Sequence, residues 1–130
     1  MNKAITLLFT IVIVFGHSTA FSEEYAIITS KTSPLADRGE QVSNIIVQLY
    51  LKARSNWEGV RGKPFARPAN SPEQRAFRSK VLGLSENEVE QHWLSVKQKN
   101  GEVSPKVLKS NKILVKLITK YDGAFSVVKK

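Results

Sequence analysis

The chain has 130 residues and a formal net charge of +9 at neutral pH, and it contains no cysteine. This length predicts one domain around a single core and leaves no room for two lobes. The absence of cysteine excludes disulfide bridges and a lipid-modified cysteine after a leader. The excess of lysine and arginine suggests anionic partners, but the positive residues are spread from Lys31 to Lys130, which favours an ordinary solvated surface.

The first 20 residues have the layout of a secretory signal peptide. Lys3 precedes an apolar run from residue 4 to residue 15, and Ser18 and Ala20 place small residues before a cleavage site after Ala20. The run is too short to span a bilayer as a helix, although an uncleaved N-terminal anchor is the alternative. We therefore expect residues 1–20 to be a signal peptide and residues 21–130 to form a periplasmic or secreted domain. Export disfavours nucleic acid as a partner, and we expect no stable membrane insertion after cleavage.

The first half of this domain is predicted to contain two strands and a helix. Residues 25–29 are apolar, as in a buried strand, and residues 30–39 form a loop rich in turn residues. The next segment has apolar residues that share one helical face: Val42, Ile45, Ile46, Leu49 and Tyr50. Two glycines predict a loop over residues 56–63, and residues 64–67 form a short extended segment, with its proline at a strand start or sheet edge.

Two helices with strong start and stop signals follow. Ser71 is an N-cap with Pro72 at the first helical position, and Gly83 ends this helix. Ser85 and Glu88 form a capping box for the next helix, which ends at Asn100-Gly101. Its apolar face is predicted to contain Val89, His92, Trp93 and Val96.

A last helix and a closing strand complete the pattern. Ser110 is expected to cap the helix, and its inward face is expected to contain Ile113, Leu114, Leu117, Ile118 and Tyr121. Residues 124–128 form an apolar strand that we expect beside residues 25–29. The fold class is therefore α/β, with a short sheet of about three strands packed by about four helices.

Several short motifs follow one another in a recognisable order along residues 26–128. They include Trp57 before a Gly62-Lys63-Pro64 turn, Arg67-Pro68 before a Ser-Pro helix start, and a closing Gly123-Ala124-Phe125. In order and spacing they resemble the small, single-lobe relatives of phosphate ABC-transporter substrate-binding proteins. The closing motif departs from the usual Gly-Ala-Ile-Gly-Tyr-Val of such relatives. The resemblance implies a type II periplasmic-binding-protein-like fold reduced to one lobe, and by itself it does not imply that a ligand binds.

Two segments are candidates for binding a small oxyanion. Ser30, Lys31 and Thr32 follow the first strand, where ligands of open α/β sheets gather, although hydroxyl residues are also common in any turn. The second segment contains Arg67, Asn70 and Ser71 at a helix start. The resemblance implies an ion partner in Arg67 and a hydroxyl donor in Ser71, although Asn70, Pro72 and Glu73 depart from the family's Gly-Ser-Gly-Thr. The alternatives are a surface or interface charge for Arg67 and an ordinary N-cap for Ser71.

The residues do not predict catalysis. His92 is the single histidine of the domain, and with Glu88 four residues earlier it suits packing better than metal binding. We expect a non-enzyme with no catalytic residues, no metal ligands and no cofactor. One function is a solute-binding or ligand-sensing protein for a small oxyanion such as phosphate. The other is a protein-interaction or sensor-accessory module that has lost ligand binding, whose lysines from Lys97 to Lys120 dock on an acidic envelope protein.

Overall fold

The computed structural model describes residues 11–13, 16–20, 24–36 and 40–130. Two apolar strands from opposite ends of the domain form the centre of its main sheet. Strand β3 (Tyr25–Ser30) runs antiparallel to β8 (Ala124–Lys129), in register from Tyr25 opposite Lys129 to Thr29 opposite Phe125. The prediction that residues 124–128 lie beside residues 25–29 is confirmed.

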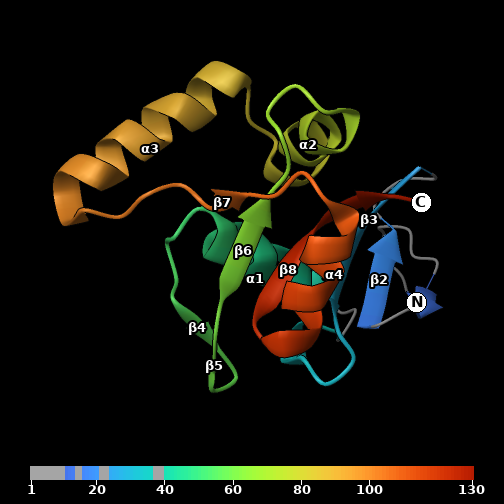
Figure 1. Ribbon diagram of the computed structural model, residues 1–130. Coiled ribbons are helices and arrows are strands. Elements are labelled where there is room, and N and C mark those ends of the chain that lie inside the picture. Colours follow the sequence, from blue (N-terminus) through green and yellow to red (C-terminus); the bar gives the residue numbers. More distant parts are fainter. Residues whose placement is uncertain (1–10, 14–15, 21–23, 37–39) are drawn as a thin grey trace.

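Further strands extend the sheet on both sides (Figure 1). In spatial order the sheet contains β1 (Ile11–Ile13), β2 (Gly16–Ala20), β3, β8, β6 (Lys63–Ala66) and β7 (Lys106–Val107). Strand β6 is parallel to both β8 and β7, whereas the pairs on the β3 side are antiparallel. The fold is thus mixed α/β, and the expected sheet of about three strands was too small. Pro64 is the second residue of β6, near the strand start that its missing N–H favours.

The part of the predicted leader that the structure describes lies in this sheet. Strand β2 pairs along β3 from Gly16 opposite Ser30 to Ala20 opposite Ala26, and β1 pairs with β2. Residues 1–10 and 14–15, which hold Lys3 and most of the apolar run, lie outside the described residues, as do residues 37–39 of the predicted loop. Signal cleavage stays a prediction.

The helices begin and end largely where the sequence predicts. They are the short 3-10 helix η1 (Pro34–Ala36), α1 (Glu40–Tyr50), α2 (Pro72–Ala76), the π-helix η2 (Phe77–Leu82), α3 (Glu86–Asn100) and α4 (Asn111–Lys120). The hydroxyls of Ser71, Ser85 and Ser110 each accept a hydrogen bond from a backbone N–H three residues later. Gly83 and Gly101 end η2 and α3 with φ of 69° and 72°, a conformation that glycine adopts without strain.

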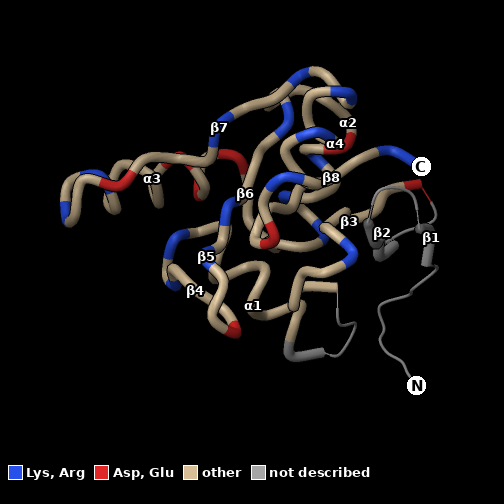
Figure 2. The backbone as a smooth tube through the Cα atoms, turned by 60° about the horizontal axis from the view of Figure 1, so that its bottom comes forward, with Lys and Arg blue, Asp and Glu red and all other residues tan. Residues whose placement is uncertain are grey.

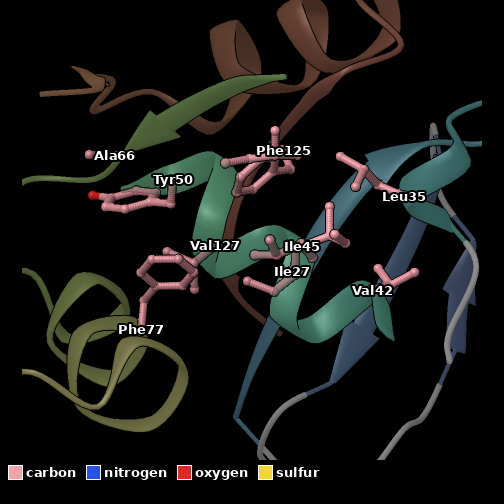
Figure 3. Packing of buried hydrophobic residues seen from close by; sticks show 11 residues of the cluster. Ile27, Leu35, Val42, Ile45, Tyr50, Ala66, Phe77, Phe125 and Val127 are labelled. Carbon is pink, nitrogen blue, oxygen red and sulfur yellow. The ribbon is translucent and has the colours of Figure 1, made fainter. Parts of the chain in front are cut away.

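Helices α1 and α4 cover opposite faces of the sheet, so the molecule has two apolar cores (Figure 1). Alternate residues of β8 pack into the two cores, because successive side chains of a strand point to opposite faces of the sheet. Phe125 and Val127 pack with α1 and with Phe77 of η2, as Figure 3 shows. Ala124 packs on the other side with Leu114 and Ile118 of α4.

One residue of a predicted apolar face points outward, and the face predicted for residues 86–100 is half-buried. The side chain of Ile113 is 51% exposed, so its inward placement was wrong. It lies about 100° around α4 from Leu114, at the edge of the stripe that faces the sheet. Helix α3 projects from the domain and has no fully buried residue, although Trp93 packs partly on the core on the α1 side. Among the described helices, none has the length and apolarity needed to cross a bilayer.

Candidate functional site

The Ser30–Thr32 loop already holds an anionic group of the chain itself. Thr32 Oγ1 donates to Asp122 Oδ1 at 2.6 Å, and Ser30 Oγ donates to the same oxygen at 3.4 Å. Thr32 N also donates to Ser30 Oγ, while Lys31 is exposed. The hydroxyls that the sequence offers for an oxyanion therefore bind the carboxylate that follows α4.

Arg67 lies inside the domain, with 3% of its surface exposed. Its guanidinium donates to the carbonyl oxygens of Leu108, Lys109 and Val127 at 2.9–3.0 Å and to Asn111 Oδ1 at 2.6 Å. Burial lowers the pKa of Arg67, and Glu73, whose carboxylate lies 4.0 Å from Nη1, opposes that change. These contacts join the start of α4 to β8 and use four of the five N–H donors of the guanidinium.

Ser71 and Asn70 have local roles at the start of α2. Ser71 Oγ accepts from Gln74 N and donates to the carbonyl oxygen of Pro68 at 2.7 Å. Asn70 is exposed, and its carbonyl oxygen accepts from Arg75 Nη1. Helix α2 has only five residues, so its dipole offers little to an anion.

The structure does not bring the two predicted segments together. The Ser30–Thr32 loop contacts Asp122, just beyond the C-terminal end of α4, whereas Arg67 contacts Asn111 at its N-terminal end. The ten residues of α4 place these ends about 15 Å apart. The six candidate residues therefore cannot surround one small ion.

A cationic pocket lies instead where the turn between the short strand β5 (Val60–Arg61) and β6 meets the turn between α4 and β8. Its volume is about 450 Å³, and its lining residues are Val60, Arg61, Gly62, Lys63, Lys120, Tyr121, Asp122 and Gly123. Lys63 Nζ lies 4.6 Å and Lys120 Nζ 5.3 Å from the centre of the Tyr121 ring, so both ammonium groups lie close to this one aromatic ring. Sequence reasoning missed this pocket because its residues come from two segments about 60 positions apart.

Close backbone approach holds the two turns of the pocket together. Lys63 N donates to the carbonyl oxygen of Gly123 at 2.8 Å, where β6 begins to pair with β8. A Cβ on Gly123 would overlap the carbonyl oxygen of Arg61. Glycine at position 123 thus allows the backbone of the α4–β8 turn to approach the carbonyl oxygen of Arg61.

Glu88, His92 and the two tryptophans of the chain all contact other parts of the domain. Glu88 Oε1 accepts from Ser85 N in the capping box, and His92 Nε2 lies 2.7 Å from the carbonyl oxygen of Leu51. A carbonyl only accepts, so Nε2 carries the proton and cannot at the same time bind a metal. Trp93 contacts Tyr50, and the Arg54 guanidinium lies over the Trp57 ring. Within the described residues, no three metal-binding side chains of the His, Cys, Asp or Glu type form a group.

Comparisons of the chain with protein-family models, with curated proteins and with solved structures give no significant match.

Proposed function

We propose that this chain is an exported, non-enzymatic binding protein for a small oxyanion such as phosphate. Its architecture would be a periplasmic-binding-protein-like single lobe, similar to the substrate-binding component of phosphate ABC transporters. The observation that carries the proposal is the cationic pocket between the β5–β6 and α4–β8 turns. It takes the place of the two segments that the sequence suggested.

The charges of the pocket favour an anion. Arg61, Lys63 and Lys120 contribute three positive charges and Asp122 one negative charge, so the lining carries a net charge of +2 (3 − 1). Lys63 and Lys120 both lie near the Tyr121 ring, and an oxyanion bound in the pocket would offset the repulsion between their two charges. Arg61 adds a planar donor that suits two oxygens of one ion.

Asp122 is the one acid in this lining, and its position matters for the proposal. Its Oδ1 accepts hydrogen bonds from the Ser30 and Thr32 hydroxyls, which direct the carboxylate towards the β3 side. Hydrogen bonds to a carboxylate stabilise its charge locally. The loop that was predicted to bind the ligand therefore contacts the pocket only through Asp122.

The pocket is large enough for phosphate, since ligand sites usually measure about 300–1,000 Å³. Arg61, Lys63 and Lys120 are all exposed, so salt screens their attraction for an anion. We therefore expect weak binding that decreases as the ionic strength rises.

The proposal predicts that calorimetry detects inorganic phosphate or sulfate binding at low salt. The double variant Lys63→Gln, Lys120→Gln should bind about tenfold or more weakly, because two charge-assisted contacts are lost. The double variant Lys97→Gln, Lys99→Gln is a matched control, since it removes the same charge from α3, away from the pocket. No measurable binding of either anion to the unmodified chain would contradict the proposal, as would equal losses in the two double variants.

A further inference from the structure

Three lysines form a row along the outer side of α4. Lys112, Lys116 and Lys120 are spaced four residues apart and are exposed, and we name them the α4 lysine row. The helix Asn111–Lys120 contains no acidic residue. Figure 2 shows that α3, in contrast, carries both charges. The α4 lysine row is thus a one-sign surface on an otherwise mixed molecule.

This arrangement lowers the stability of the helix. Lys112 is the second residue of α4, where the positive end of the helix dipole disfavours a cation. Like charges four residues apart also repel each other along the row. Helix α3 has the opposite and favourable arrangement, with Glu86 and Glu88 in its first turn and Lys97 and Lys99 in its last. A row of lysines without acidic residues gives no benefit to a helix face that is merely in contact with water. The same row is useful on a face that binds anions.

We propose that the α4 lysine row binds the surface of a bilayer that contains anionic lipid headgroups. Protein interfaces are enriched in arginine and aromatic residues and depleted in lysine, and α4 contains neither arginine nor an aromatic residue. Each lysine near an anionic bilayer contributes to binding by electrostatic attraction. No fixed contact geometry is needed, because lipid headgroups can move to meet the charge. The charge and composition of this face therefore fit a lipid surface better than an acidic protein.

The position of Ile113 supports the same orientation. Ile113 follows Lys112 and precedes Lys116 by three residues, so it lies on the row's side of α4, and it is 51% exposed. Such an apolar side chain can enter the headgroup region while the lysines contact phosphates. Leu114 and Ile118 remain buried against the sheet, so the helix binds at the surface and does not insert.

The test is co-sedimentation of the full chain with vesicles of phosphatidylcholine, either pure or with about 30% phosphatidylglycerol. We expect salt-sensitive binding to the mixed vesicles alone. The double variant Lys112→Gln, Lys116→Gln should bind about 25-fold more weakly, since each lysine contributes about fivefold. The control variant Lys97→Gln, Lys99→Gln has the same net charge, and its affinity for the mixed vesicles should decrease much less. Neither Lys112 nor Lys116 lines the cationic pocket, so this test is independent of phosphate binding.

A single substitution separates a binding role from a structural one. Lys112→Glu should raise the melting temperature, because an acid suits the first turn of α4 and pairs with Lys116, yet it should weaken vesicle binding. Binding that is equal for pure and mixed vesicles would overturn the proposal. So would equal losses in the two double variants, or binding to soluble polyglutamate without binding to the mixed vesicles, which would indicate an acidic protein partner.

Discussion

Arg67 shows how a single buried side chain can fix the relation between distant segments. Its guanidinium reaches Leu108, Lys109 and Asn111 before and at the start of α4, and Val127 in β8. Three of these acceptors are backbone oxygens, which need donors when they are buried. Its backbone N–H donates to Gln74 Oε1, and Gln74 Nε2 in turn donates to the hydroxyl of Tyr50. Arg67 therefore links α4, β8 and α2 through hydrogen bonds rather than through an external ion.

Replacement of Arg67 by lysine is predicted to destabilise the domain strongly. An ammonium group lacks the planar fork of donors, so at least two of the four acceptors lose their partner. Each buried group left without a partner costs about 1–3 kcal/mol, which gives a loss of about 3 kcal/mol in the free energy of unfolding. Denaturant titration measures it. Arg75→Lys is the control, because Arg75 is exposed and makes one side-chain bond to Asn70, and a loss as large there would contradict the argument.

At the scale of elements, the β4–β5 hairpin supports one wall of the cationic pocket. Strands β4 (Asn56–Trp57) and β5 (Val60–Arg61) pair through the two-residue turn Glu58-Gly59. Both turn residues have positive φ, 50° and 79°, as a type I′ turn requires. Glycine adopts this conformation freely, but glutamate does so at a steric cost.

Glu58→Asn is therefore predicted to stabilise the domain. Asparagine tolerates positive φ and is the preferred first residue of this turn, so we expect a gain of about 0.5–1 kcal/mol in the free energy of unfolding. Thermal denaturation followed by circular dichroism measures the gain. Glu58→Gln removes the same charge without the conformational benefit, and an equal gain in that variant would show that charge, not backbone conformation, is responsible.

The sequence predicts some elements better than others. Features whose partners are close in the chain can be predicted, whereas features that depend on distant partners cannot. Ser71, Ser85 and Ser110 were recognised as caps because a cap and the N–H that it accepts from lie within one turn. The hairpin was interpreted as a loop because Glu58 is an unusual residue for its turn. The cationic pocket depends on the pairing of β6 with β8, which no local pattern encodes. The role of Arg67 depends likewise on partners about 40 and 60 residues away.

At the scale of the molecule, the described core residues come from the region after the predicted cleavage site. The two apolar clusters contain residues from Ile27 to Val127, and β3 and β8 join them at the centre of the sheet. Strand β2 adds backbone pairing along the outer side of β3. Removal of residues 1–20 would leave the residues named in both clusters in the chain but would make β3 an edge strand with unpaired backbone groups.

The signal-peptide prediction and the sheet can be tested together. If the leader is cleaved after Ala20, mass spectrometry of the exported protein should find an N-terminus at Phe21. A chain of residues 21–130 should then fold cooperatively, because the two clusters remain, with a lower melting temperature because the β2–β3 pairing is lost. Amide hydrogen exchange should be faster along β3 than in the full-length chain, while β8 stays protected by its neighbours β3 and β6. A truncated chain that does not fold would show that residues 16–20 belong to the domain and are not a removable leader.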